Sequence, residues 1–207
     1  EPAEFSRQEI LDFLGEEGTQ HEKVFTNALQ LMQQAQNLGS VMQFNVKDDE
    51  LRFFKQRWEA LRIEAKTDLT KQTLTQKLEP FLNVLFTLTS RYEAIAANPP
   101  YMGHKNMNDD LKSFVNSFFP NTKTDLCTVF VEGMPALTSV HGKYSFIIPP
   151  SWMFLSTFEN FRKHIIQNKK IESLLHLSRG VFGADFGSVC TVISNNKALN
   201  GKGIYFR

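Results

Sequence analysis

The stretch Ile95-Ala96-Ala97-Asn98-Pro99-Pro100-Tyr101-Met102-Gly103 (IAANPPYMG) runs from an apolar segment directly into two consecutive prolines. Proline fixes its own φ, removes a backbone N–H donor and pushes the preceding residue toward extended geometry. Asn98 and Pro99 are therefore restricted, and the turn offers carbonyl oxygens and an amide oxygen but few N–H groups. Tyr101 adds an aromatic face. The stretch predicts a rigid loop at the end of a strand, suited to a flat group that donates hydrogen bonds.

Around this loop, short strands alternate with helices from residue 91 onward, a pattern that indicates an α/β fold with a largely parallel sheet and helices on its faces. Ligands of such sheets bind beyond the carboxyl ends of the strands, which is where the NPPY loop falls. The expected strands are residues 92–97, 143–148, 171–177 and 188–194, and the expected helices are residues 108–119, 124–140 and 155–167.

The first ninety residues have the spacing of helices. Ser6-Arg7-Gln8-Glu9 has capping-box spacing and opens a short amphipathic helix that ends at Gly15. A second helix is expected from apolar residues between Val24 and Ala35, with a stop at Gly39. Two more are expected to be capped by Asp48 or Asp49 and by Asp68, the last one bent or broken near Pro80. The sequence thus divides into a helical region, 1–90, and an α/β region, 91–207.

Composition places the chain among globular proteins and reveals an uneven charge distribution. Its 207 residues are 42% hydrophobic and 22% charged, enough for one large or two small domains. Residues 1–97 carry 11 Lys and Arg against 15 Asp and Glu, a net charge of −4, whereas residues 98–207 carry 12 against 7, a net of +5. The basic half begins at the proline loop and favours an anionic partner there, although an ordinary solvated surface explains it equally well.

Several function classes are disfavoured by what the sequence lacks. Cys127 and Cys190 lie in apolar segments without CxxC spacing, and the five histidines show no HxxxH or HExxH pattern, so we expect reduced cysteines and no metal. No stretch resembles a membrane span or a signal sequence, and the first residue is Glu1, not Met. We therefore expect a cytoplasmic protein without membrane partners, and a chain that is a piece of a longer protein.

The loop's chemistry suits an exocyclic amine on a planar base. The oxygen of Asn98 and the carbonyl of Pro99 could accept both amine hydrogens and turn the nitrogen lone pair toward an electrophile, while Tyr101 stacks on the ring. If the electrophile is a sulfonium methyl group, the reaction needs geometry more than a strong base. A proline-rich structural turn is the alternative explanation of the same residues.

The wider sequence strengthens the first interpretation through a resemblance. The order of four stretches resembles the catalytic half of TaqI-like, gamma-class adenine-specific DNA methyltransferases. These stretches are NPPY, DLCTVFVEG from Asp125, GKYSFIIPPSWMFL from Gly142 and GVFGADFGSVCTVISN from Gly180. Three longer stretches are similar to the PglX-type methyltransferases of BREX phage-defence systems. They are NPPYMGHKNMNDDLKSFV, SWMFLSTFENFRKHI and LLHLSRGVFGADFGSV. The resemblance is dense over 92–207 and looser over the helical half.

This resemblance implies a fold and a set of roles. The fold is a partial Rossmann-like methyltransferase sheet preceded by a helical region, and the activity is adenine-N6 methylation of double-stranded DNA. Asn98, Pro99 and Tyr101 would bind the target adenine, with Pro100 stiffening the turn. For the opposite ring face of the flipped base, we expect Phe182, with Phe186 as the alternative. For these phenylalanines, burial in the core is the competing explanation. Trp152 would shape the pocket or belong to the core.

One departure limits what the chain can do alone. The resemblance implies S-adenosylmethionine as methyl donor, bound by a glycine-rich turn after a strand that precedes NPPY. Before Asn98 no such strand and turn are recognisable, because Gly15, Gly18 and Gly39 stand alone among helices. We therefore expect the donor site largely outside this chain, an internal fragment that is inactive alone, and other defence-system subunits as partners. Methylation of a protein glutamine amide and a non-catalytic binding or assembly module remain alternatives.

Overall fold

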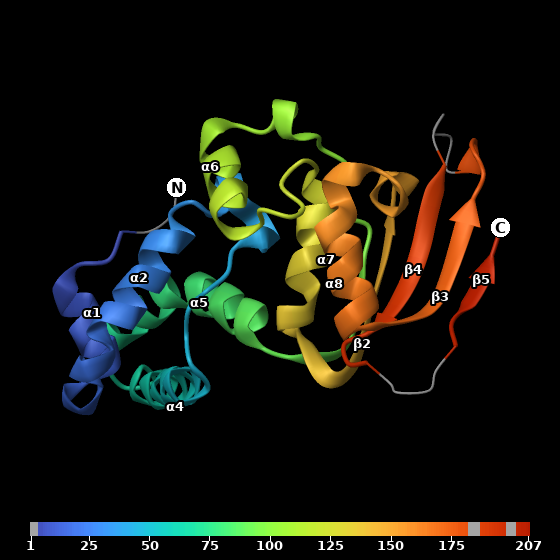
Figure 1. Cartoon of the computed structure of the whole chain (residues 1–207). Helices are drawn as coiled ribbons and strands as arrows, with labels where there is room; N and C mark the ends of the chain where they lie inside the picture. Colours follow the sequence, from blue (N-terminus) through green and yellow to red (C-terminus); the bar gives the residue numbers. More distant parts are fainter. Residues whose placement is uncertain (1–3, 182–186, 198–201) are drawn as a thin grey trace. The chain divides into compact units, whose positions relative to one another are not determined.

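The computed structural model describes residues 4–181, 187–197 and 202–207. Contacts within the chain divide it into two compact units, residues 1–90 and 91–207. Figure 1 shows that the described part of the first unit is built of helices and that the second contains a sheet. The mixed α/β architecture expected from the sequence is confirmed.

The first unit contains helices whose ends follow local sequence signals. Ser6 caps α1, because its Oγ accepts from the Glu9 N–H at 3.2 Å and the Glu9 carboxylate accepts from the Ser6 N–H at 2.7 Å. Asp68 caps α5 through bonds to its Oδ1 from the backbone N–H groups of Thr70 and Lys71. Both predicted caps are confirmed. The elements are α1 (Arg7–Leu14), η1 (Glu16–His21), α2 (Glu22–Met32), α3 (Ala35–Leu38), η2 (Gly39–Val41), α4 (Asp48–Glu64) and α5 (Leu69–Thr89).

Three details of this unit differ from expectation. The expected second helix is interrupted between α2 and α3. The N–H of Gln34 donates to the carbonyl of Leu31, three residues back instead of the four of an α-helix, and the chain turns there. The residue that caps α4 is Lys47, so the prediction of Asp48 or Asp49 was wrong. Those two carboxylates lie in the first turn, where they offset the helix dipole. Pro80 does not break α5, which is 21 residues long in total and runs through the proline. Apolar side chains are buried on both sides of it.

Aromatic rings form the core of the helical unit. The Phe25 ring is fully buried, with its centroid 4.8 Å from that of Phe13, 5.1 Å from Phe54 and 5.4 Å from Phe81. Each ring comes from a different helix, so this cluster joins α1, α2, α4 and α5. The buried members of the core are Ile10, Phe13, Leu14, Phe25, Ala28, Leu29, Phe54, Trp58, Leu61, Leu74, Leu78, Phe81, Leu82 and Leu85.

The second unit begins with β1, whose bounds, Tyr92–Ala97, agree with the prediction, as do those of β4. The predicted helix 124–140 ends early, at Leu137, and the chain continues directly into β2. Asn195 stabilises this junction by donating from Nδ2 to the carbonyls of Pro135, Thr138 and Ser139. The elements are β1 (Tyr92–Ala97), η3 (His104–Asn106), α6 (Asp109–Phe118), α7 (Leu126–Leu137), β2 (Thr138–Ile148), η4 (Pro150–Met153), η5 (Ser156–Phe158), α8 (Glu159–Asn168), β3 (Lys170–Leu177), β4 (Ser188–Ser194) and β5 (Ile204–Phe206).

The sheet is mixed, and the prediction of a largely parallel sheet was wrong. Its order is β1-β2-β4-β3-β5, with β1/β2 and β3/β5 parallel but β2/β4 and β3/β4 antiparallel. A parallel connection needs a crossover of about a dozen or more residues, usually containing a helix. Residues 178–187 between β3 and β4 are too few for that, so β4 returns antiparallel beside β3.

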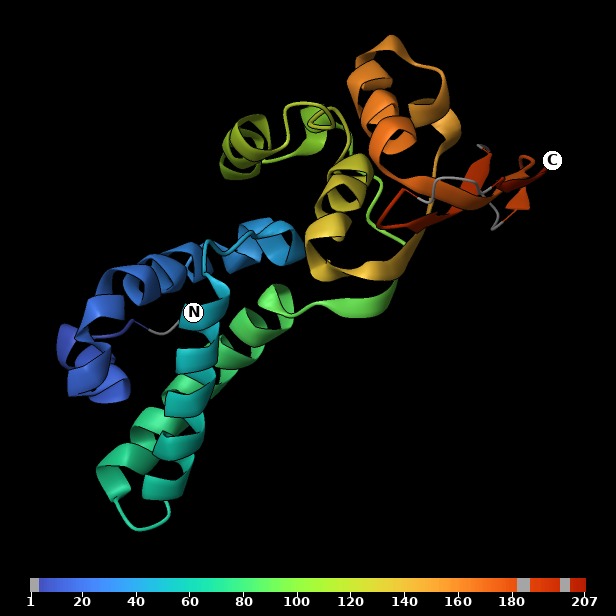
Figure 2. The ribbon, with the colours of Figure 1, turned by 60° about the horizontal axis from the view of Figure 1, so that its bottom comes forward.

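Helices α7 and α8 cover one face of the sheet (Figure 2). Alternate residues of β2, Tyr144, Phe146 and Ile148, point into this core, together with Val131 of α7 and Ile165 of α8. Ser145 and Ile147 therefore belong to the opposite face. That alternation decides which side chains are available beside the NPPY loop.

Strand β1 lies at one edge of the sheet, and within the described residues only β2 pairs with it. An unpaired edge is a template for association. We expect either concentration-dependent association of the chain through this edge or its cover by another segment, and in both cases slow amide exchange at residues 92–97. Sedimentation and residue-resolved exchange, with the doubly paired β4 as reference, test this prediction. A strictly monomeric chain with fast exchange at 92–97 would contradict it.

Candidate active site at the carboxyl end of β1

The NPPY loop leaves β1 at Ala97 and is anchored at its far end. The carbonyl of Met102 accepts from the Leu126 N–H, and the N–H of His104 donates to the Thr124 carbonyl, both at 2.9 Å. Gly103 also forms an isolated bridge with Asp125, the residue that caps α7. The loop is therefore held between the end of a strand and the start of a buried helix, so its four residues have little freedom to move.

Within the loop, the Tyr101 hydroxyl links two strand ends. Its oxygen lies 3.0 Å from Asn98 Oδ1 and 3.1 Å from the backbone carbonyl oxygen of Ile147. Asn98 follows β1 and Ile147 is near the end of β2, and these two strands are adjacent and parallel. The side chains of Asn98 and Tyr101 are both exposed, whereas Pro99 is buried and Pro100 exposed. Sequence reasoning placed Asn98 and Tyr101 in one loop but did not foresee their hydrogen bond.

A cavity of ≈ 350 Å³ opens beside Asn98. A volume of this size falls at the lower end of the range of small-molecule sites. Small side chains on β1 and β2 leave this space, and Cys190 of β4 contributes its half-buried thiol. The lining residues are Ala96, Ala97, Asn98, Ser145, Phe146, Ile147 and Cys190.

Of the seven lining residues, only Asn98 was among the predicted site residues. Ser145, Ile147 and Cys190 are three that the prediction missed. A signal for two of them was present in the sequence. Once 143–148 is a strand, Ser145 and Ile147 must share the face opposite to Phe146. Cys190 could not have been found in this way, because its approach to Ile147 depends on the antiparallel pairing of β2 with β4.

The electrostatics of this region favour hydrogen bonding over acid–base chemistry. Burial, with a smaller contribution from Cys127, raises the pKa of Tyr101 above its ordinary value, so the hydroxyl keeps its proton and acts as a donor near neutral pH. Burial raises the pKa of the Cys127 thiol far more strongly. This shift leaves that thiol protonated and unreactive. In the described part of the chain, no group of three His, Cys, Asp or Glu side chains is arranged to hold a metal ion.

Trp152 is part of the core and does not line the cavity. It is 3% exposed, and its ring centroid lies 6.0 Å from that of Phe146 and 6.0 Å from that of Phe161. Its place on the helix-covered side of the sheet follows from packing between β2 and α8. The other two expected base contacts, Phe182 and Phe186, lie outside the described residues.

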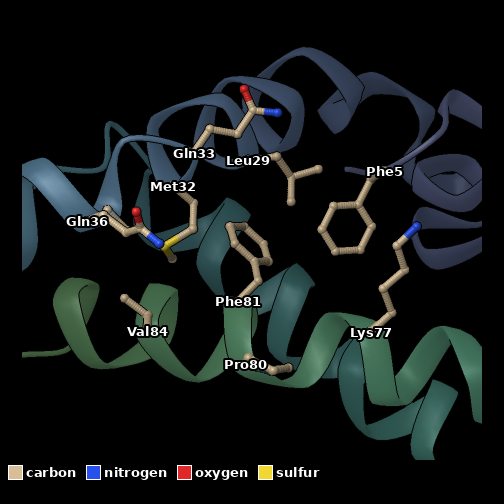
Figure 3. Close-up of a pocket in the computed structure, with 10 residues that line it drawn as sticks. Phe5, Leu29, Met32, Gln33, Gln36, Lys77, Pro80, Phe81 and Val84 are labelled. Atoms are coloured by element: carbon tan, nitrogen blue, oxygen red, sulfur yellow. The ribbon is translucent and has the colours of Figure 1, made fainter. Parts of the chain in front are cut away.

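A second cavity, of ≈ 380 Å³, lies in the helical unit between α2, α3 and α5 (Figure 3). Phe5, Met32 and Phe81 provide much of its apolar wall. Lys77 stands at one side, but its ammonium already bonds to Glu9 at 2.6 Å and lies 4.8 Å from the Phe5 ring centroid. No pair of groups is set for chemistry there, so we place the candidate active site in the sheet unit.

The described residues do not fit a binding site for S-adenosylmethionine of the expected kind. Residues 4–90 contain helices and turns and no strand that leads into a glycine-rich turn. Gly15 and Gly39 have positive φ, but each follows a helix and ends it. In the same described ranges, no helix is long and apolar enough to cross a membrane.

Comparison with known proteins identifies similar sequences. Residues 18–182 match the model of the Eco57I restriction-modification methylase family. The chain is 35% identical over 190 residues to the adenine-specific methyltransferase BrxX of Escherichia coli O9:H4 (strain HS), covering 89% of this chain and 16% of that protein. It is 34% identical over 113 residues to the adenine-specific methyltransferase PglX of Lacticaseibacillus casei (strain Zhang), covering 55% and 9%. The chain thus spans less than a fifth of either relative's length.

Solved structures show more distant similarity. The Type IIL restriction-modification enzyme MmeI, solved in complex with DNA, matches 60% of this chain and 18% of its own, with 18% identity and a TM-score of 0.48. A putative class I S-adenosylmethionine-dependent methyltransferase from Listeria monocytogenes matches 100% of this chain and 74% of its own, with 15% identity and a TM-score of 0.46.

Proposed function

The chain belongs to the Eco57I restriction-modification methylase family, and from this premise we propose that it supplies the target-base pocket of an adenine-N6 DNA methyltransferase. The observation that carries this proposal is the acceptor-rich NPPY loop, in which Asn98 lines a cavity beside the parallel strands β1 and β2. The names of the two similar proteins, both adenine-specific methyltransferases, support the choice of adenine.

Asn98 and Pro99 are the proposed acceptors for the exocyclic amine. An amino group conjugated to a purine ring is a poor nucleophile, because its lone pair is delocalised into the ring. Two acceptors that each take one N–H bond hold the nitrogen in place and favour a geometry in which the lone pair points out of the ring plane. Preorganised polar contacts of this kind act on charge that develops in the transition state, and they cost no reorganisation during the reaction. Pro100 keeps the turn stiff.

Tyr101 is the proposed stacking platform for the adenine ring. The residue is 41% exposed, so part of it is accessible even though the hydroxyl is engaged. A base inside duplex DNA cannot reach such a loop, so the target adenine must be flipped out, and enzymes that act on flipped bases stack them between aromatic or apolar side chains. Phe182, or alternatively Phe186, remains the proposed cover of the opposite face. The net charge of +5 on residues 98–207 suits the DNA phosphates.

S-adenosylmethionine is the proposed methyl donor, and it supplies an electrophilic methyl group carried on a sulfonium. Because the described residues do not fit a site for it, we place that site in a part of the protein outside this chain. The contribution of this chain is then to bind the base, to orient the amine and to exclude water. We also propose a cytoplasmic location, which a DNA substrate supports. Other subunits of a phage-defence or restriction-modification system are proposed partners.

The proposal predicts a clear difference between the full-length protein and this chain alone. With labelled S-adenosylmethionine and mixed-sequence DNA, the full-length protein should form N6-methyladenine, identified by mass spectrometry of the digested DNA. The isolated chain should give background incorporation, because the donor site is proposed to lie elsewhere.

Robust transfer by the isolated chain would overturn the placement of the donor site. Full-length protein that methylates cytosine, or a protein glutamine instead of DNA, would overturn the choice of adenine. Full-length protein that binds S-adenosylmethionine and DNA without turnover would favour a binding module.

A further inference from the structure

The Tyr101 hydroxyl has one proton and, among the described residues, bonds to two acceptors at similar distances. Asn98 Oδ1 lies at 3.0 Å and the Ile147 carbonyl oxygen at 3.1 Å. A phenol donates one hydrogen bond, so when the proton points at one acceptor, the hydrogen bond to the other acceptor is weak or absent. The two arrangements differ by a rotation of the hydroxyl hydrogen alone and need no movement of the ring or the backbone.

The two acceptors have different surroundings. Ile147 O belongs to the backbone of β2, where Ile147 pairs with Cys190 of β4, so this carbonyl cannot turn away. Asn98 Oδ1 belongs to an exposed side chain whose terminal amide torsion is broad and two-fold in character. A donor at 3.0 Å selects the oxygen over the nitrogen of that amide, because Nδ2 is itself a donor. The hydroxyl thus determines which end of the Asn98 amide lies toward Tyr101.

We propose that the Tyr101 hydroxyl is a positioning group that orients Asn98 before the base arrives and then transfers its hydrogen bond to the Ile147 carbonyl. This inference rests on the proposed function and goes beyond the stacking role of the ring. Before binding, the hydroxyl holds Oδ1 in place. When the adenine amine donates to Oδ1, the hydroxyl proton turns to Ile147 O. The hydroxyl proton therefore has an acceptor at both stages, Asn98 Oδ1 before the base binds and Ile147 O afterwards.

Tyr101→Phe separates this role from stacking, because phenylalanine keeps the ring and removes only the hydroxyl. In full-length enzyme we expect kcat to fall about tenfold, the order of one net hydrogen bond, while KM for DNA stays within about twofold because stacking is retained. Tyr101→Ala should raise KM as well. Base flipping, followed by the fluorescence of 2-aminopurine at the target position, should be unchanged in Tyr101→Phe and reduced in Tyr101→Ala.

A double-mutant cycle provides the decisive measurement. Tyr101→Phe should lower kcat in the wild-type background and have no further effect in an Asn98→Ala background, because the group to be positioned is then absent. Tyr205→Phe, which removes the hydroxyl of an exposed tyrosine on β5, is the matched control and should leave kcat and KM unchanged.

The outcomes separate this inference from the function on which it rests. Wild-type activity on adenine with an unaltered kcat in Tyr101→Phe, or an equal fall in both backgrounds, would overturn the positioning role and leave the proposed function intact. A wild-type enzyme without adenine methylation would remove both together. The inference is supported if Tyr101→Phe lowers kcat when Asn98 is present and has no effect on kcat in the Asn98→Ala background.

Discussion

Asn98→Ala in the full-length protein should lower the rate of DNA methylation by on the order of a hundredfold or more, by analogy with the loss of one preorganised polar contact. The substitution removes Oδ1, the proposed acceptor for the adenine amine and the acceptor of the Tyr101 hydroxyl bond. The melting temperature should change little, because Asn98 is exposed in a loop and contributes little to core packing.

Single-turnover methylation with saturating DNA and donor, normalised to folded protein, measures this effect. Asn116→Ala, which removes an exposed asparagine from α6 in the same unit, is the control and should keep the rate within about twofold, as surface substitutions usually do. If Asn98→Ala instead destabilised the protein by several kcal/mol and methylation per folded molecule were intact, NPPY would be a structural turn.

Phe25→Ala should remove about 3–5 kcal/mol of stability from the helical unit, the usual cost of deleting a buried phenylalanine. Phe25 is fully buried, and three other rings lie within 5.4 Å of its centroid. A cavity at the point where four helices meet cannot be filled without moving several of them. Since small domains are stable by only about 5–15 kcal/mol, a loss of this size would remove roughly a third to a half of the stability of a domain at about 10 kcal/mol.

Denaturant unfolding and residue-resolved amide exchange test this prediction together. Exchange should accelerate throughout α1, α2, α4 and α5. Ile63→Ala, at a position on α4 that is 65% exposed, is the control and should change stability by less than about 0.5 kcal/mol. A Phe25→Ala variant that unfolds at the wild-type denaturant concentration would show that the four rings do not form the core of this unit.

The features predicted correctly from the sequence are those determined by residues close together in the chain. The caps at Ser6 and Asp68 depend on hydrogen bonds that span two or three residues. The bounds of β1 and β4 follow from short apolar runs between turn residues, and the loop after β1 follows from its prolines. In each case a side chain and its partner are close in sequence, so the pattern alone contains the information.

The features that only the tertiary structure decided join residues far apart in the chain. The Tyr101 hydroxyl meets the Ile147 carbonyl across 46 positions, and Cys190 reaches the cavity through strand pairing. Trp152 lies in the core because α8 packs over β2. The direction of β4 depends on a connection too short for a helical crossover. Such contacts depend on strand order and on which face a helix covers, and these are set by the burial of the whole apolar surface together.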